Sequence, residues 1–322
     1  MEKPVDDEEI RDTIFSMKPL KAPGSDGLHA IFYQAQWEVV GKSVCKQIKA
    51  FFNGEIVPED FLKILIVLIP KIDNPTSLNS FRPISLCTIM YKTITKIITN
   101  RLKTFLLNLV GPHQTSFVPG RHITENIIIA QEVIHSMRRK TGKRGFMAIK
   151  VDLEKTYDRL SWEFIEETLA FVGLLTNFIR IIMECITSGS MQILWNGKLT
   201  ESFKTSRGIC QGDPISPYIF VLCIERLSHI INREVQQERW KPIRLSMNGI
   251  PLTHLFFADD LLLLAEASSD QANVVIKALK NLCNMSGEKV STNKTRLYLS
   301  KNVAPTVSKK ISELSDFSTS KN

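Results

Sequence analysis

Residues 255–265 read LFFADDLLLLA, two adjacent carboxylates inside an otherwise apolar stretch. An ionised carboxylate is costly to desolvate, so Asp259 and Asp260 require an exposed turn, cationic partners or a metal ion. Two buried strands joined by an Asp-Asp turn would meet the first requirement, and a bound cation would meet the third. Taken alone, the stretch favours the simple hairpin.

A second apolar segment also ends in a carboxylate. Over residues 145–152 the large apolar side chains recur at every second position, which predicts a strand with Asp152 projecting from its far face at the end. The core face would consist of Met147, Ile149 and Val151. Mg²⁺ prefers oxygen ligands and usually takes one or two carboxylates plus substrate phosphates. Asp152 with Asp259 is therefore a ligand set of the kind that two-metal phosphoryl transfer requires.

The remaining elements mix helices and strands without a strict alternation. Apolar runs at 61–70 and 81–86, separated by a polar turn, predict one hairpin, and Asn196-Gly197 predicts the turn of another over 191–203. Helical apolar spacing extends over residues 86–109, 123–137, 161–172, 177–187 and 216–237. This mixture indicates an α+β fold.

The composition is that of a folded protein with a polyanionic partner. The chain has 322 residues, and 41 basic against 33 acidic side chains give a net charge of +8, which favours nucleic acid as partner. The six cysteines are scattered singly, which argues against a zinc ribbon or a disulfide framework. We find no signal peptide and no apolar run of about 20 residues, so we expect no membrane contact and an intracellular location, nuclear or cytoplasmic.

Two further motifs are open to more than one interpretation. Residues 207–217, RGICQGDPISP, combine glycines and prolines before a helix, which suits either close contact with a substrate or an ordinary loop. Residues 69–71 and 81–83 each carry one cation beside a proline. By themselves these cations are most simply explained as solvated surface charges.

Taken in order, seven segments resemble the reverse transcriptases of non-LTR (LINE-type) retrotransposons, the plant members especially. The segments are KAPGSDGLHAIFYQAQW (21–37), LIPK with FRPISLC (68–71 and 81–87), QTSFVPGRHITENI (114–127), KVDLEKTYDRLSW (150–162), SRGICQGDPISPYIF (206–220), HLFFADDLLLL (254–264) and SGEKVSTNKT (286–295). The resemblance spans residues 8–301, and seven motifs in family order are far more specific than FADD alone.

The resemblance implies a right-hand polymerase with an antiparallel palm sheet. The acidic residues 6–9, followed by regularly spaced apolar ones, predict an N-terminal helix at 1–19. The polymerase regions would be fingers at 20–145, a palm with an interleaved fingers segment at 146–301, and a tail at 302–322 leading towards a thumb. We expect that thumb and the family's upstream endonuclease to be missing.

The implied activity is RNA-directed DNA polymerisation, in which deoxynucleotides are added to a primer 3′-hydroxyl by two-metal phosphoryl transfer. The partners would be an RNA template, a DNA primer and deoxynucleoside triphosphates, with two Mg²⁺ ions that Mn²⁺ can replace. Asp152 and Asp259 would bind the metals, Asp260 would support them, and Lys294 would supply a proton to the leaving pyrophosphate.

The resemblance also implies a substrate site. Tyr157 matches the aromatic residue that lies under the sugar of the incoming nucleotide and discourages ribonucleotides. Lys71 and Arg82 match the cations that grip the triphosphate. Gln211 and Gly212 match the loop that packs on nucleotide and template.

Some residues depart from the family pattern. Thr156 stands where Ala is usual. Its extra bulk beside Tyr157 is expected to overpack the nucleotide pocket, which would cost about 1–3 kcal/mol. A catalytically incompetent remnant that at most binds nucleic acid is the alternative interpretation. An intron-encoded maturase of the same fold is less well supported, because the LINE-type motifs match better.

Overall fold

The computed structural model describes residues 3–55, 58–246 and 248–319 and divides into two compact units. Unit 1 comprises residues 1–105 and 161–219, and unit 2 comprises residues 106–160 and 220–322. Helices are mixed with two sheets in which antiparallel pairing dominates, so the predicted α+β class is confirmed. The predicted fingers and palm boundaries stay a prediction.

The helices of unit 1 begin with α1 (Asp7–Phe15), which starts as the acidic N-terminal residues predict. The Asp6 carboxylate accepts a hydrogen bond from the Glu9 amide at 2.9 Å, and acidic residues fill the first turn, where the helix dipole favours negative charge. The other helices of the unit are α2 (Ala30–Ala35), α3 (Trp37–Phe52), α4 (Ile89–Lys103), α8 (Trp162–Phe171), α9 (Thr176–Thr187) and the 3₁₀ turns Glu59–Leu62 and Leu78–Ser80.

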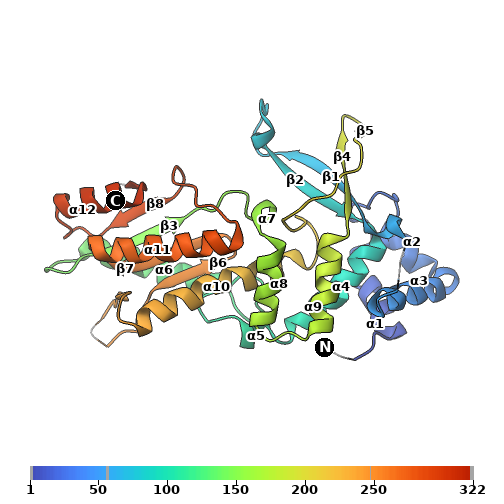
Figure 1. Ribbon diagram of the computed structural model, residues 1–322, viewed down its shortest axis with the longest axis horizontal. Coiled ribbons are helices and arrows are strands. Elements are labelled where there is room, and N and C mark those ends of the chain that lie inside the picture. Colours follow the sequence, from blue (N-terminus) through green and yellow to red (C-terminus); the bar gives the residue numbers. More distant parts are fainter. Residues whose placement is uncertain (1–2, 56–57, 247, 320–322) are drawn as a thin grey trace. The chain divides into compact units, whose positions relative to one another are not determined.

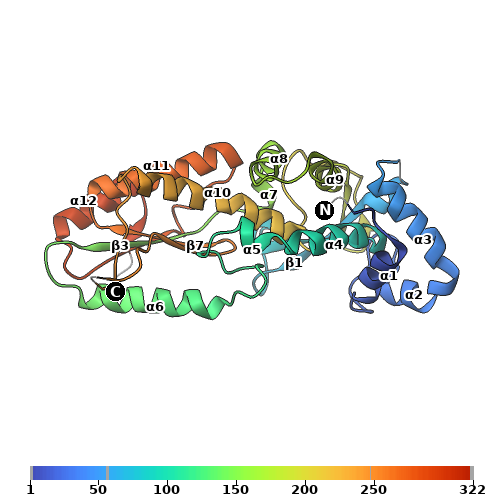
Figure 2. The ribbon, with the colours of Figure 1, turned by 90° about the horizontal axis from the view of Figure 1, so that it is seen from below.

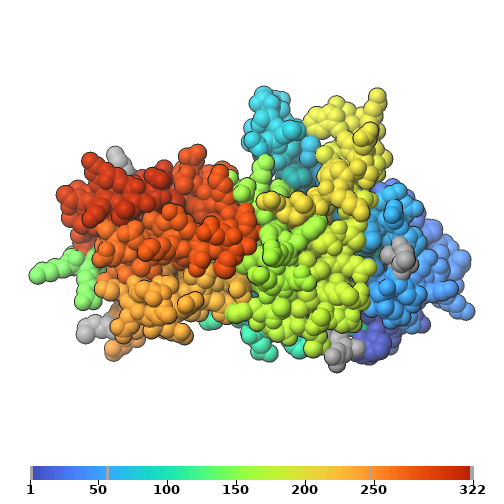
Figure 3. Space-filling model, in the orientation of Figure 1, coloured from blue at the N-terminus to red at the C-terminus, as the bar shows by residue number. Residues whose placement is uncertain are grey.

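The sheet of unit 1 has the strand order β2-β1-β4-β5. Its strands are β1 (Lys63–Pro70), β2 (Phe81–Cys87), β4 (Ser190–Trp195) and β5 (Lys198–Leu199). Strands β1 and β2 form the predicted antiparallel hairpin, and β4 and β5 form the second one, with positive φ at both turn residues, Asn196 and Gly197. Both hairpins stand out from the helical part of unit 1 (Figures 1 and 3).

The prediction of a single helix over 86–109 is wrong. Strand β2 continues to Cys87, and the side chain of Thr88 then accepts a hydrogen bond from the Tyr91 amide at 3.2 Å, which starts α4 at Ile89. Helix α4 ends before Thr104, and a separate short helix, α5 (Leu106–Leu109), follows. The helix predicted over 216–237 is present as α10 (Ser216–Gln236).

The sheet of unit 2 has the strand order β6-β7-β3-β8-β9. The strands are β3 (Phe146–Val151), β6 (His254–Phe257), β7 (Asp260–Glu266), β8 (Arg296–Leu299) and β9 (Ser318–Thr319). Strand β3 is central and runs antiparallel to both β7 and β8, whereas β9 pairs parallel to β8. The hairpin expected from residues 255–265 is therefore present as β6 and β7.

Helices cover this sheet on both faces. Helix α6 (Ile123–Arg139) packs on one face, where its Val133 and Met137 form a cluster with Ala148 of β3 and Leu264 of β7. Helices α10 and α11 (Ser269–Ser286) lie on the other face (Figure 2). The one-sided core face predicted for β3 is thus only half right, since Ala148 is as fully buried as the residues that alternate with it.

The remaining helices of unit 2 are α7 (Thr156–Arg159) and α12 (Pro305–Ser315). Across the described ranges of the chain, none of the helices is both long enough and apolar enough to cross a bilayer.

Candidate active site

Asp152 and Asp259 lie at the same edge of the sheet in unit 2. Asp152 directly follows β3, and Asp259 directly precedes β7. Because Val151 lies opposite Leu261 in the antiparallel β3–β7 pair, the end of β3 meets the start of β7. Two carboxylates that are more than 100 residues apart in sequence are therefore carried by neighbouring strand ends.

The turn between β6 and β7 consists of Ala258 and Asp259, since Phe257 pairs with Asp260 across the hairpin. The predicted Asp-Asp turn is thus shifted by one residue. Asp259 is exposed, and Asp260 forms an ion pair with Lys150, whose Nζ lies 3.2 Å from Oδ1. Asp260 therefore has a cationic partner on β3.

The segment after α11 runs alongside the end of β3. The Ser291 amide donates to the Asp152 carbonyl at 2.8 Å, and Lys294 Nζ lies 4.0 Å from Asp152 Oδ1. Lys289, the other lysine of the SGEKVSTNKT motif, lies instead 3.4 Å from Glu154. The structure thus brings Lys294, and not Lys289, to Asp152.

Tyr157 lies beside the carboxylate edge. Its ring stacks on Phe220 of α10, with centroids 5.4 Å apart and planes 17° apart. Burial, reinforced by the charge of Asp259, raises the pKa of Tyr157 to about 12, so its hydroxyl stays protonated at physiological pH. Thr156 is buried at the start of α7, and its neighbour Tyr157 retains this stacked position.

The carboxylate edge fits an open magnesium site and not a closed one. In the described part of the chain, no three His, Cys, Asp or Glu side chains are grouped as metal ligands, so Asp152, Asp259 and Asp260 do not form such a cluster. Two carboxylates suffice, however, where phosphates and water complete the coordination shell. The side chain of Asp152 is 41% exposed, which leaves its oxygens accessible to an ion.

Lys71 and Arg82 belong to the β1–β2 hairpin of unit 1. Arg82 lies on β2 opposite Ile69, and Lys71 directly follows β1. Lys71 Nζ donates to the Asn79 carbonyl at 3.1 Å, so it is held at the end of the hairpin.

Gln211 and Gly212 form a loop that is held against β2. The Gln211 carbonyl accepts a hydrogen bond from the Ser85 amide at 2.7 Å. Gly212 has a φ of +117°, and a Cβ at this position would lie 2.8 Å from the Ser85 carbonyl oxygen. Only glycine fits so close to the backbone of β2.

Next to this loop, unit 1 contains a cavity of about 640 Å³ that is rich in lysine. Five lysines line it together with Gly212 and Tyr218, and none of its described lining residues is acidic: Lys18, Lys21, Lys92, Lys96 and Lys103. Burial lowers the pKa of Lys92 and, with repulsion from neighbouring lysines, that of Lys96. Such a cavity favours a polyanion.

The sequence model of the family described as "Reverse transcriptase (RNA-dependent DNA polymerase)" matches residues 69–314, which is most of the chain. The chain belongs to the reverse transcriptase family. This confirms the family that the seven motifs predict.

Curated relatives of this reverse transcriptase chain include proteins of transposable elements. The "Transposon TX1 uncharacterized 149 kDa protein" of Xenopus laevis is 28% identical over 83% of this chain, and the Pol polyprotein of the element R2DM of Drosophila melanogaster is 28% identical over 62%. The chain spans about a fifth of each relative, 20% and 18%. The "Uncharacterized mitochondrial protein AtMg01250" of Arabidopsis thaliana is 53% identical over 55 residues, only 17% of the chain, so the plant affinity stays a prediction.

Solved structures support the polymerase fold. An apo telomerase from Candida tropicalis, truncated from its C-terminal domain, has a TM-score of 0.52 at 15% identity and covers 88% of this chain and 59% of its own. At such low identity the likeness shows the fold alone.

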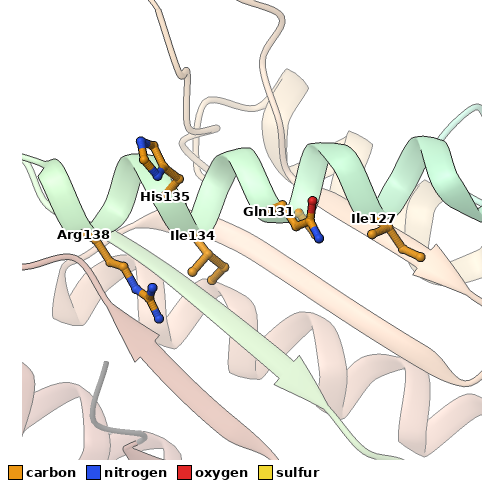
Figure 4. A pocket seen from close by; sticks show the side chains of 6 residues that line it. Ile127, Gln131, Ile134, His135 and Arg138 are labelled. Atoms are coloured by element: carbon orange, nitrogen blue, oxygen red, sulfur yellow. The ribbon is translucent and has the colours of Figure 1, made fainter.

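The reverse transcriptase residues predicted from the motifs fall into two groups. Unit 2 carries Asp152, Asp259, Asp260, Tyr157 and Lys294, and unit 1 carries Lys71, Arg82, Gln211 and Gly212. A shallow cavity of about 460 Å³ along α6, lined by residues such as Gln131, His135 and Arg138, contains none of them (Figure 4).

Sequence reasoning missed two features of these units. The lysine cavity had a local signal, because Lys92, Lys96 and Lys103 recur at helical spacing on α4. Gln114 begins the motif at 114–127, but its role could not be inferred from there, because its side chain accepts a hydrogen bond from the Ala258 amide, 144 positions away in sequence.

Proposed function

We propose that this chain is the RNA-directed DNA polymerase core of a LINE-type retroelement, which adds deoxynucleotides to a primer 3′-hydroxyl. The observation that carries the proposal is the meeting of Asp152 and Asp259 at one sheet edge, where β3 ends and β7 begins. The family match and the non-LTR relatives support the same reaction.

Asp152 and Asp259 would hold two Mg²⁺ ions, which Mn²⁺ could replace. When bound, the ions would stabilise negative charge on the attacking and leaving oxygens. Lys294 lies beside Asp152, so its ammonium group is suited to give a proton from Nζ to the leaving pyrophosphate. Asp260 would support the two metal ligands indirectly, because its ion pair with Lys150 ties the start of β7 to β3.

Tyr157 would select the sugar of the incoming nucleotide. Its ring is fixed by stacking on Phe220, and a rigid ring excludes a ribose 2′-hydroxyl better than a mobile one. A protonated Tyr157 hydroxyl beside Asp259 would add no negative charge to the metal-binding edge.

Unit 1 would bind the phosphates. We assign Lys71 and Arg82 to the triphosphate of the nucleotide, because both cations lie on the exposed β1–β2 hairpin. Gln211 and Gly212 would pack on nucleotide and template. The lysine cavity, next to Gly212, is suited to the phosphates of the RNA template.

Primer extension on an RNA template annealed to a DNA primer, with deoxynucleotides and Mg²⁺, tests the proposal. Asp152→Asn and Asp259→Asn should each lower the extension rate by about a hundredfold or more, because charge on the reacting oxygens is no longer stabilised. Asp270→Asn, at an exposed position of α11, is the matched control and should extend at the wild-type rate.

If wild type and both aspartate variants extended the primer at the same rate, the proposed metal-binding role of Asp152 and Asp259 would be refuted. No extension by wild type would refute the proposed activity for this chain and leave the nucleic-acid-binding remnant as the better interpretation.

A further inference from the structure

We propose that Gln114 is a positioning residue that holds the Ala258–Asp259 turn in the conformation needed for metal binding. The inference rests on the proposed metal role of Asp259. It concerns a side chain with no part in the substrate site, located in the segment between α5 and α6.

The turn has a conformation that requires support. Ala258 has a φ of +51°, in the left-handed region that residues with a Cβ rarely adopt. This conformation costs about 1–2 kcal/mol in a non-glycine residue. Such strain persists only where the surrounding structure holds the backbone in place.

The Gln114 side chain provides this support directly. It is 1% exposed, and its Oε1 accepts hydrogen bonds from the Ala258 amide at 3.2 Å and from the Ser116 amide at 2.9 Å. Two N–H donors on one oxygen fix which end of the amide faces the turn. The Ala258 amide is the backbone group directly before Asp259.

The segment that carries Gln114 is itself bound to β6. The Phe256 amide donates to the His113 carbonyl at 2.8 Å, and the Thr115 amide donates to the Phe256 carbonyl at 3.2 Å. Asn126 of α6 donates from Nδ2 to both carbonyls, at 3.1 and 2.9 Å. Gln114 therefore reaches the turn from a segment that is fixed to the same hairpin.

The Nε2 end of the Gln114 amide shows why the Oε1 end matters. Within the described residues, its buried Nε2 has no hydrogen-bond partner. An unpaired buried donor is destabilising. An apolar side chain of similar size would avoid this penalty but could not accept the Ala258 N–H. The amide of Gln114 thus acts here through Oε1, which accepts the hydrogen bond from the Ala258 amide.

The test uses the full chain as wild type, Gln114→Leu and Gln114→Met, with two matched controls. Thr115→Val removes a buried hydroxyl that has no partner among the described residues, in the same segment but without a bond to the turn. Gln131→Leu makes the same substitution on the exposed surface of α6 (Figure 4).

The first measurement is hydrogen–deuterium exchange of the peptide covering residues 255–262, without metal. Loss of one hydrogen bond should speed exchange there by about tenfold in the Gln114 variants. The second is the shift in melting temperature on adding Mn²⁺, which should fall to less than half of the wild-type shift. The third is primer extension, in which the half-saturating Mg²⁺ concentration should rise more than the rate at saturating Mg²⁺ falls. Both controls should behave as wild type.

Unchanged exchange in the Gln114 variants, or faster exchange with an unchanged Mn²⁺ shift, would overturn the inference and leave the proposed function intact. A wild type that is not stabilised by Mn²⁺ would overturn both, because Asp259 would then bind no metal. Loss of cooperative unfolding in both Gln114 variants would show a purely structural residue and would also overturn it.

Discussion

Glu288 gives this protein a pH dependence that one substitution should remove. The side chain is 4% exposed, and neither carboxylate oxygen accepts a hydrogen bond within the described part of the chain. Burial is the main cause that raises its pKa to about 8, with the charge of Arg159 opposing the shift and that of Asp158 adding a smaller upward contribution. The folded chain therefore keeps this carboxyl protonated at neutral pH.

The size of the effect follows from the two pKa values. Between the ordinary value of 4.5 and about 8, the folded state binds one proton that the unfolded state has released. The unfolding free energy therefore falls as pH rises, by about 1.4 kcal/mol per pH unit and by about 5 kcal/mol over the whole interval. The Glu288→Gln substitution keeps the size and shape of the side chain but removes the ionisable carboxyl group.

Urea unfolding at several pH values, followed by circular dichroism, measures the difference between wild type and Glu288→Gln. This difference should shift in favour of the variant by about 4 kcal/mol between pH 5 and pH 8. Glu132→Gln, on the exposed side of α6, is the control and should show no such change. A constant difference between wild type and Glu288→Gln across this range would refute the reasoning.

Two further predictions concern the substrate site. Tyr157→Ala should raise ribonucleotide incorporation relative to deoxyribonucleotide incorporation in primer extension. Phe220→Leu should do so more weakly, because the Tyr157 ring loses its stacking partner. Unchanged sugar selectivity in both variants would rule out the proposed role of Tyr157. Gly212→Ala should lower the unfolding free energy by about 1–3 kcal/mol, because the added Cβ meets the Ser85 carbonyl and the φ is unfavourable; a melting temperature equal to wild type would contradict it.

The parts of the fold that follow a local period could be predicted from the sequence. Alternation over residues 145–152 gives β3, and the two short apolar runs around Asp259 give β6 and β7. Asn196-Gly197 gives a turn because both residues tolerate positive φ. The motifs then identify which strand ends carry the carboxylates, although their pairing at one edge becomes visible only in the register of β3 with β7.

The parts that depend on distant contacts could not be predicted. Apolar spacing continues through residues 86–109, so nothing local shows that Thr88 starts a helix and that α4 ends before Thr104. The size of Thr156 predicts crowding beside Tyr157, but no local pattern predicts that the Tyr157 ring stacks on Phe220, which comes from α10. The same holds for Gln114, whose partner is in another hairpin.

Burial explains why the chemistry is confined to the ends of the strands. Strand β3 is buried on both faces, so an unpaired charge within it would be very costly. Lys150, the exposed position of β3, is paired with Asp260 at the start of β7. Asp152 lies just after the end of β3 and Asp259 just before the start of β7, where a carboxylate can meet water, cations or phosphates. A sheet covered by α6 on one face and by α10 and α11 on the other therefore accommodates the Asp152 and Asp259 carboxylates at this edge and not within its strands.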